Sequence, residues 1–559
     1  MASNQFSNKD ASRMDDEFDK TDQSIKVEEQ KDHHHHKKGG ILQGALSGNV
    51  QTELTHFERR AALINTELET LGFGRYQQCI WLLCGFGYFL DLTWSKGVGL
   101  MATALYQEMG VPGDKQGLIF TCANVGLALG AVGFGLISDI IGRKWAFNIT
   151  CLITSIFGML MTAVKYNYAA VCGIYLIASI GLGGNIPIDA TIALEFMPPS
   201  KRYLVALMSM WQPIGVVTAC AISYGTAARY RCDPELLSCR DSSLADGEEC
   251  CSVSSNMGWR YGFLIIGSMT LFIFFARYFV FRFHESPKYL ISKGRDQDAI
   301  DVLHKIAKFN KCAPPTLTIE DFRDLDRSMG IDPDEQPFTD RTNAKGVVMR
   351  AVKELSFLKG LFTRKLTCFI FVLLGFTYMG NFWSFNLAGS FLPIILLRNN
   401  VDSGRATVDQ TYQQYIYIYL PGILGTVMAF FSIELPIVGR KWSLVFSAAM
   451  QGLAMAMYTQ VKTTAGYVGL NALAYIMQNF FNAVLYASAP ELFDTTYRAS
   501  ANGMLSCLGR IAGIVAPLAG QQFIDEGRMG VLWLGAGGIW LSSFLMVFLP
   551  VEMRGRQMY

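Results

Sequence analysis

Ionisable residues inside long apolar stretches are the features of this sequence best suited to chemistry. Asp91 lies within the apolar segment Gly85–Trp94, and Arg510 lies in the middle of another, Leu508–Gly513. A charge in a hydrocarbon environment is costly unless it faces a cavity or a partner. A buried carboxylate can bind and release a proton, and an arginine can hold a carboxylate or phosphate through two parallel hydrogen bonds. We therefore expect Asp91 to serve in proton coupling and Arg510 in binding an anionic group.

Structural roles remain open for these charges. Lys96, five residues after Asp91, could neutralise the carboxylate, and Arg510 could pair with an acid of its own half of the chain. Asp189 follows Pro187 at the end of a Gly-rich segment that we expect to break its helix. An irregular helix beside a charge is typical of a transport site. Asp189 is therefore a second candidate for proton coupling, with a gate residue as the alternative.

Amide and aromatic side chains recur in four of the apolar stretches. They could hydrogen-bond and stack on a small polar solute at the walls of a cavity, although each alone is more often a helix-packing residue. The candidate binding residues are Trp211, Gln212, Asn381, Trp383, Asn386, Tyr415, Tyr419, Gln478, Asn479 and Asn482.

Two motifs repeat at nearly the same interval and divide the chain into two copies of one unit. Gly-Arg-Lys-Trp occurs at 142–145 and again at 439–442, an offset of 297 residues. The segment Glu195–Arg202 is answered by Glu491–Arg498, at an offset of 296 residues. Such a parallel repeat of a membrane unit is typical of transporters.

The composition agrees with a membrane protein. Hydrophobic residues make up 51% of the chain and charged residues 17%, and runs of about 20 apolar residues meet the length needed to cross a bilayer. A net charge of +2 over 559 residues argues against a nucleic-acid binder. The sequence holds no phosphate-binding glycine loop, metal cluster or nucleophile constellation, so we predict no enzyme, cofactor or metal site.

The predicted fold is all-α, with twelve transmembrane helices in two six-helix halves and a cytosolic helical linker. The expected regions are a disordered tail (1–50), an N-terminal half (51–283), the linker (284–363), a C-terminal half (364–550) and a short tail (551–559). The expected spans are 76–104, 115–138, 145–164, 168–194, 203–226, 259–283, 365–395, 412–434, 443–461, 465–489, 499–522 and 529–549.

Lysine and arginine in the short loops predict the orientation. Four alternate loops carry Arg143 and Lys144, Lys201 and Arg202, Arg440 and Lys441, and Arg498. The positive-inside rule places these loops and both termini in the cytosol. A polar loop that contains Cys232, Cys239, Cys250 and Cys251 then faces outward, where at least one disulfide is expected. Zinc is the competing interpretation, but no histidine lies nearby. We favour the plasma membrane over an internal membrane.

The segment Gly135–Lys144 resembles the signature of the major facilitator superfamily between its second and third helices. Further stretches, at 72–77, 183–189, 285–290 and 490–493, resemble the synaptic-vesicle-protein-related branch in its fungal form. The resemblance implies alternating access and an acidic proton-coupling position like Asp91. It also implies a group of residues that govern conformational switching at the cytosolic face. These are Asp139, Gly142, Arg143, Lys144, Glu195, Arg202, Gly439, Arg440, Lys441, Glu491 and Arg498.

Together these features predict a secondary-active transporter of a small polar organic solute. We expect the solute to be anionic and carboxylate-like and its transport to be coupled to protons. The partners would be the lipid bilayer, the solute and protons, with no nucleic acid and no required oligomer. A facilitator of a neutral sugar and a non-transporting receptor or scaffold on the same fold are the alternatives.

Overall fold

The computed structural model describes residues 56–549, with gaps at 202, 234–235, 241–248, 281–282, 331–364, 403–406, 436–437, 462, 494–497 and 527–529. The chain from Arg60 onward forms one compact unit, and the description below concerns that unit. The expected tails (1–50 and 551–559) lie outside the described residues, and so does the linker from residue 331 onward.

The first six membrane segments form the N-terminal half. They are α3 (Arg75–Met109), α4 (Leu118–Ile141), α5 (Arg143–Leu160), α6 (Tyr168–Phe196), α8 (Trp211–Gly225) and α9 (Gly258–Phe275). A short helix α7 (Tyr203–Leu207) and a 3₁₀ turn (Met208–Met210) precede α8, so the fifth expected span is interrupted near its start.

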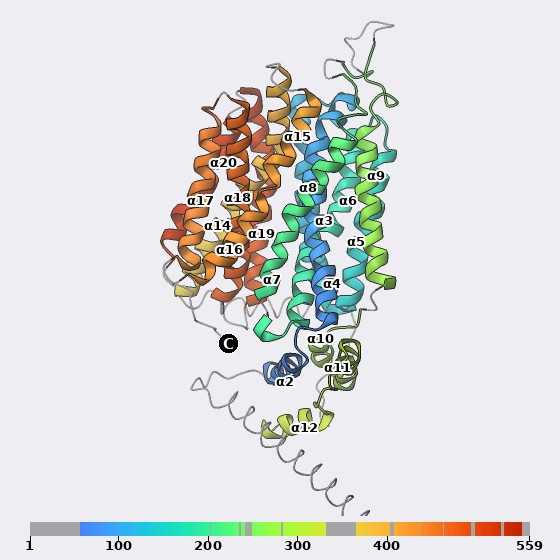
Figure 1. Ribbon diagram of the computed structural model, residues 1–559, viewed down its shortest axis with the longest axis vertical. Coiled ribbons are helices and arrows are strands. Elements are labelled where there is room, and N and C mark those ends of the chain that lie inside the picture. Colours follow the sequence, from blue (N-terminus) through green and yellow to red (C-terminus); the bar gives the residue numbers. More distant parts are fainter. Residues whose placement is uncertain are drawn as a thin grey trace, which may run out of the picture. The chain divides into compact units, whose positions relative to one another are not determined.

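The second six segments form the C-terminal half. They are α14 (Lys365–Asp402), the pair α15 (Val408–Tyr419) and α16 (Gly422–Glu434), α17 (Gly439–Tyr458), α18 (Thr464–Ser488), α19 (Arg498–Glu526) and α20 (Gly530–Val547). Pro421 separates α15 from α16 because proline cannot donate the backbone bond that would continue the helix. Figure 1 shows the two halves as neighbouring helix bundles.

The expected break of the fourth helix is wrong. Helix α6 continues through Pro187 to Phe196. Membrane helices tolerate proline where neighbouring helices support the freed backbone groups. Here the Gly-rich segment lets α6 approach α4 closely, because a Cβ at Gly183 or Gly184 would collide with Leu127 or Phe134. Close packing thus keeps the helix continuous where the local sequence favours a break.

Glycines set the closest helix contacts in both halves. A Cβ at Gly126 or Gly130 of α4 would collide with backbone carbonyls of α6, and a Cβ at Gly425 of α16 would collide with the carbonyl of Ile476 in α18. These are the second and fourth segments of each half. Small residues that let backbones approach are the usual means of packing helices in membranes. The two halves therefore share this glycine contact between their second and fourth segments.

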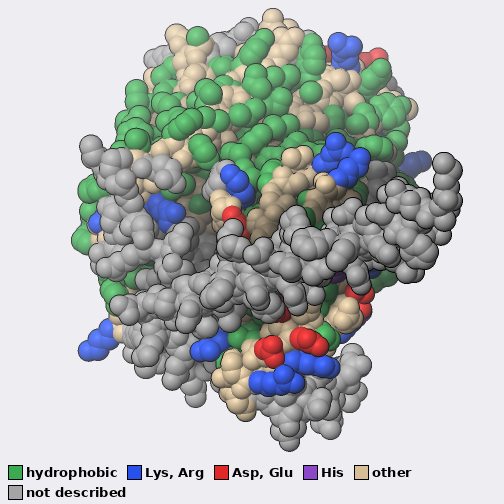
Figure 2. Space-filling model, turned by 60° about the horizontal axis from the view of Figure 1, so that its bottom comes forward, with side chains coloured by type: hydrophobic (Ala, Val, Ile, Leu, Met, Phe, Trp, Pro, Cys, Tyr) green, Lys and Arg blue, Asp and Glu red, His purple; other side chains and the backbone are tan. Residues whose placement is uncertain are grey.

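The sides of the bundle are apolar. Large hydrophobic side chains such as Phe272 and Phe431 are 70% and 64% exposed, which suits contact with lipid. Within the described residues, eight helices are long and apolar enough to cross a membrane by length and composition alone. Figure 2 shows hydrophobic side chains on the sides and charged ones at the end that carries the linker helices.

The linker helices α10 (Pro287–Ser292), α11 (Asp296–Asn310) and α12 (Ile319–Ser328) lie at one end of the bundle, here called the linker end (Figure 1). Ser286 caps α10, accepting a hydrogen bond from the amide of Tyr289, and Pro287 takes its first turn. The residues before the first span form a further helix, α2 (His56–Leu71). Arg60 of α2 pairs with Asp296 at 2.5 Å, so α2 is tied to the linker helices.

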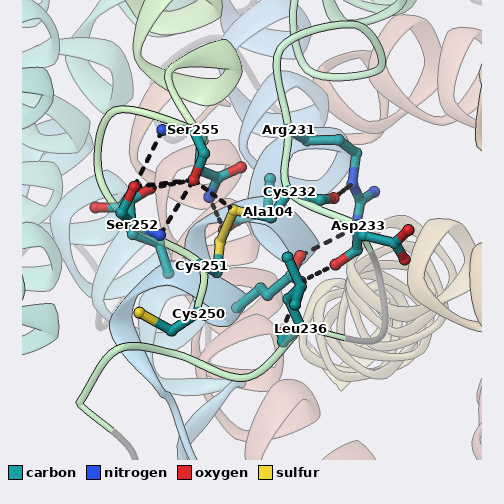
Figure 3. The surroundings of a disulfide bond; sticks show 12 residues. Ala104, Arg231, Cys232, Asp233, Leu236, Cys250, Cys251, Ser252 and Ser255 are labelled. Carbon is teal, nitrogen blue, oxygen red and sulfur yellow. Dashed lines mark hydrogen bonds between the residues drawn. A yellow bond between two sulfur atoms is a disulfide. The ribbon is translucent and has the colours of Figure 1, made fainter. Parts of the chain in front are cut away.

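The opposite end carries two disulfides and is called the disulfide end. Cys232 bonds to Cys251, and Cys239 bonds to Cys250. Figure 3 shows the Cys232–Cys251 bond near Ala104 of α3. Asn256, five residues after Cys251, donates a hydrogen bond to the carbonyl of Ala104 (2.7 Å). The prediction of a disulfide in this loop is confirmed, and zinc is excluded as the role of these four cysteines.

Candidate functional site

The two halves meet mainly along three helix pairs, α3 with α14, α4 with α19, and α8 with α15, with smaller contacts of α7 with α18 and of α8 with α16. Asp91 of α3 and Arg510 of α19 come from opposite halves and are buried, with 9% and 6% of their surface exposed. They lie close enough for their charges to interact. Neither makes an ion pair or hydrogen bond with any residue that the structure describes, and Arg510 Nε is buried without a partner. The acid that acts on the charge of Arg510 is therefore Asp91 of the other half. The expected alternative, a pair with an acid of the C-terminal half, is not formed among the described residues.

Lys96 does not neutralise Asp91. Its ammonium lies over the ring of Phe385, 4.4 Å from the ring centroid, and 5.9 Å from that of Tyr419. Both rings belong to the C-terminal half. Asp91 and Lys96 therefore do not form the structural ion pair that the sequence left open.

Asp189 has a different partner, Arg277 just beyond α9. Arg277 Nη2 lies 3.4 Å from Asp189 Oδ2, and both side chains are fully buried. The same guanidinium donates to the carbonyls of Leu83 (2.8 Å) and Phe147 (3.2 Å) and lies 3.7 Å from the Phe147 ring centroid. Asp189 is therefore tied within the N-terminal half, whereas Asp91 has no such ion pair among the described residues.

Three of the predicted amides form one network inside the C-terminal half. Asn381 donates to Asn482 (2.8 Å), and Gln478 donates to Asn381 (2.8 Å) and Asn482 (3.3 Å). Gln451, which the sequence analysis did not single out, donates to Gln478 and to Ser384. The network joins α14, α17 and α18. In this structure the amides are therefore hydrogen-bonded to one another.

The other predicted binding residues are spread around this interface. Asn386 accepts a hydrogen bond from Asn124 of α4 (2.9 Å), across the two halves. Trp383 donates to the carbonyl of Leu534, and Asn479 to that of Tyr475. Tyr415 packs on Tyr412, and Tyr419 packs edge-on against Tyr475. Gln212 is buried, and the indole Nε1 of Trp211 is buried without a hydrogen-bond partner.

The halves are bonded to each other toward the disulfide end. The hydroxyl of Tyr412 donates to the carbonyl of Leu100 (2.7 Å), and Gln413 donates to the hydroxyl of Tyr224 (2.9 Å). Gln521 bridges the loop before α4, donating to the carbonyl of Gly113 and accepting from the amide of Gly117 (2.6 Å). Among the described residues, no hydrogen bond joins the halves at the linker end. The disulfide end is thus closed by hydrogen bonds, while α7 also packs on α18 and the turn Met208–Met210 on α16.

The first copy of the Gly-Arg-Lys motif is held at the linker end. Gly142 has φ of 98°, which only glycine adopts without strain, and it lets α5 begin at once. Glu285 accepts hydrogen bonds from the amides of Arg143 (2.9 Å) and Lys144 (3.4 Å) at the start of α5. Arg143 also lies 3.6 Å from Glu195. A carboxylate at a helix N-terminus is favourable, so Glu285 fixes this turn.

Beside this turn, His284 stacks on Tyr76 at a centroid distance of 6.1 Å. Burial, with Lys305 and Lys144 nearby, lowers the pKa of His284 below its usual value. The imidazole is therefore neutral at neutral pH, and it adds no positive charge next to Lys144.

The second copy of the motif differs. Gly439 again has a positive φ, of 53°, and Lys441 donates to the carbonyl of Leu549 (2.9 Å), a helix-end contact of the expected kind. Arg440 is half-buried at the start of α17. The side chains of the remaining predicted switching residues lie outside what the structure describes. They are Asp139, Arg202, Glu491 and Arg498.

Sequence reasoning missed Arg277, Glu285 and the pair Glu108–Arg260. Arg260 binds both oxygens of Glu108, at 2.6 and 2.7 Å, deep in the N-terminal half. Arg260 and Arg277 each interrupt an apolar run, so the criterion that selected Asp91 could have found them. Glu285 carries no such signal, because it lies in a polar segment.

One pocket of about 970 Å³ lies at the disulfide end of the N-terminal half. Its walls include Met109, Lys115, Tyr168, Cys239 and Arg240. None of the predicted binding residues contributes to it. The buried charges at the interface therefore lie apart from this surface pocket.

Two six-helix halves joined by a helical linker define the fold of the major facilitator superfamily, whose members are membrane transporters. The chain belongs to the sugar (and other) transporter family, whose profile matches residues 87–559. It is an integral multi-pass membrane transporter and not an enzyme, as the sequence predicts.

Transporters from other organisms are similar in sequence to this chain over most of its length. The MFS siderochrome iron transporter 1 of Ceriporiopsis subvermispora is 30% identical over 506 residues, 89% of this chain and 92% of the relative. The niacin transporter NiaP of Acinetobacter baylyi is 25% identical over 464 residues, 81% and 88% of the two chains. The xylose transporter XylE from E. coli, in a partially occluded inward-open conformation, matches with a TM-score of 0.59 and 15% identity, over 85% of this chain and 100% of that one. The last match shows the fold alone.

Proposed function

We propose that this chain is a proton-coupled, secondary-active transporter of a small organic anion. The observation that carries the proposal is the presence of two buried charges, Asp91 and Arg510, that are unpaired among the described residues and lie within electrostatic reach of each other. They come from opposite halves, are buried together, and have no hydrogen-bond partner among the described residues. Buried charges in a membrane protein that are not tied to structure mark a route for ions or substrate.

Asp91 is the proton site in this proposal. A buried carboxylate can bind and release a proton, and rocking of the halves would change the distance from Asp91 on one half to Arg510 on the other. Asp189 is the second candidate, but its ion pair with Arg277 lies within one half. Rocking of the halves would leave that pair intact. Asp91 is therefore better placed to couple a proton to the motion.

Arg510 is the proposed anion receptor. A planar guanidinium can bind a carboxylate with two parallel hydrogen bonds, and the Nε of Arg510 has no partner to displace. A related chain is named as a transporter of niacin, which is a small carboxylic acid. The amide network of Asn381, Gln478 and Asn482 would orient the polar part of the solute from the C-terminal half.

Alternating access accounts for the closed disulfide end. The bonds made by Tyr412, Gln413 and Gln521 would break as the halves rock to open that end. The turn of Gly142, Arg143 and Glu285 belongs to the linker end and would act in switching, together with Asp139 and the second copy of the motif. A loss of turnover with solute binding intact is the expected effect of Asp139→Asn.

The proposed topology places the linker end and both termini in the cytosol. The basic short loops and the two disulfides lie at opposite ends of the bundle, as the positive-inside rule and an oxidising exterior together require. We propose the plasma membrane as the site of action.

Uptake into proteoliposomes with and without an inward proton gradient tests the proposal. Labelled monocarboxylates, phosphate, a sugar and a ferric siderophore form the panel. An anion should accumulate in wild-type vesicles only with the gradient. Asp91→Asn should abolish accumulation and retain solute exchange, whereas Asp114→Asn, in an exposed loop, should leave both unchanged. Accumulation that survives in Asp91→Asn would place proton coupling elsewhere.

Arg510→Lys tests the receptor role separately. The variant keeps the charge and loses the planar fork, whose charge-assisted contact contributes about 1.5–3 kcal/mol. Anion affinity should fall about 10- to 100-fold, while affinity for any neutral substrate should not change. Equal binding of anions by the variant and the wild type would refute this role.

A further inference from the structure

Lys96 is a buried cation for which the proposed function has no role. It lies on α3, five residues after Asp91, and only 5% of its surface is exposed. Five residues of helix amount to an axial rise of about 7.5 Å and a rotation of about 140°. Lys96 and Asp91 therefore face different sectors of the interface.

The surroundings of the ammonium come from three helices of both halves. Phe385 of α14 and Tyr419 of α15 present their rings to Lys96 Nζ, at 4.4 and 5.9 Å from the centroids. Cys220 of α8 is a further neighbour. Lys96 makes no ion pair and no hydrogen bond with any side chain or carbonyl in the described part of the protein. Ring faces attract a cation, but they do not accept its three protons in hydrogen bonds.

An ammonium buried in this way is incompletely compensated. The other buried cations of the N-terminal half are bound by acids: Arg260 holds Glu108 at 2.6 Å, and Arg277 lies 3.4 Å from Asp189. Buried charges are retained in proteins where a partner or a ligand completes them. Because the missing group is an anion and the ammonium lies against rings of the opposite half, we expect the group that completes Lys96 to be a ligand.

We propose that Lys96, caged by Phe385 and Tyr419, binds the carboxylate of a transported acid whose flat, apolar body lies against the tyrosines of α15 and α18. Tyr419 packs edge-on against Tyr475 with 4.8 Å between centroids, so these rings form a continuous aromatic wall beside the ammonium. Ring faces and edges favour a flat apolar partner over a hydrated polyol. The inference rests on the proposed function and narrows its solute to aromatic monocarboxylates.

Lys96 and Arg510 have different surroundings, and we therefore assign them different roles in binding the solute. Arg510 lies within reach of the Asp91 charge, whereas Lys96 forms no ion pair with any acid that the structure describes. In this proposal the carboxylate of the solute binds to Lys96 of the N-terminal half, and Arg510 is a second cation for it on the C-terminal half.

Binding to the purified full-length protein in detergent tests this assignment without requiring transport. The probes are benzoate, nicotinate and phenylacetate, with benzamide, nicotinamide and phenylacetamide as neutral counterparts of the same shape. At least one acid should raise the unfolding temperature of the wild type, and its amide should not. Lys96→Met should weaken acid binding at least tenfold, because a charge-assisted contact is lost. Lys115→Met, which removes an exposed lysine, should bind as the wild type does.

The ligand-free protein gives an independent measurement. Removing an uncompensated buried charge should raise the unfolding temperature of Lys96→Met above that of the wild type. A fall in that temperature would show that Lys96 is a structural residue and would overturn the proposal. Unchanged acid binding in Lys96→Met, or no acid binding to the wild type, would also overturn it. If acids bind through Lys96 and none accumulates under a proton gradient, the transport proposal fails and this assignment stands.

Discussion

Replacing Gly126 by alanine tests whether close contact between α4 and α6 holds the N-terminal half together. A Cβ at this position would lie 2.8 Å from the Cβ of Ser179 and collide with the carbonyl oxygen of Leu176. A backbone carbonyl in a packed helix cannot rotate away, so the two helices must separate. Inserting a methyl group into a packed contact costs about 1–3 kcal/mol.

Gly133→Ala on the same helix is the matched control. A Cβ at Gly133 has no heavy atom within 4 Å, so the substitution adds no collision. Both variants gain the helix preference of alanine over glycine, about 0.5–1 kcal/mol. This gain cancels in the comparison, which leaves a difference in unfolding free energy of about 1–3 kcal/mol.

Thermal unfolding in detergent, followed by tryptophan fluorescence, measures the difference. The midpoint should fall for Gly126→Ala and stay level or rise for Gly133→Ala. Gly425→Ala, whose Cβ would meet the carbonyl of Ile476, should behave as Gly126→Ala does. Equal midpoints for Gly126→Ala and Gly133→Ala would show that the helices separate at no cost, and would refute the packing argument.

Three further predictions concern polar contacts. Asp189→Asn should destabilise the protein by about 3–5 kcal/mol, because it leaves Arg277 buried without an anion, and adding Arg277→Met should restore much of the loss in the same thermal assay. Gln521→Ala should shift the equilibrium toward opening at the disulfide end about 5- to 150-fold, the equivalent of two hydrogen bonds; spin-label distances between loops at that end report the change, and unchanged distances would contradict it. Cys239→Ser should leave Cys250 as a free thiol that reacts with a membrane-impermeant maleimide on intact cells, and absence of labelling would contradict the outward position of this loop.

Much of the fold could be predicted because a helix in a bilayer is specified locally. Each apolar run satisfies its own backbone hydrogen bonds, so length and hydrophobicity suffice to place it. The break expected at Pro187 did not occur, because tertiary packing overrode the local preference. Glycine and proline have low helix preference, but Gly183 and Gly184 allow α6 to pack closely against α4, and the helix stays continuous.

The candidate site could be predicted only in part. Asp91 and Arg510 were found because a charge inside an apolar run is conspicuous in any sequence. Their juxtaposition was not predictable, because one lies on α3 and the other on α19. Glu285 was missed because its role depends on an approach to the start of α5, 142 residues earlier in the chain.

The sequence by itself determined the membrane class, the twofold repeat, the superfamily and the presence of a disulfide-bearing loop. Only the tertiary structure decided the partners: Cys232 with Cys251, Asp189 with Arg277, and Lys96 with two aromatic rings of the other half. The physical reason is the range of the interactions. Hydrophobicity and helix formation act between near neighbours in the chain, whereas disulfides, ion pairs and cation–π contacts join residues that only the packing of helices brings together.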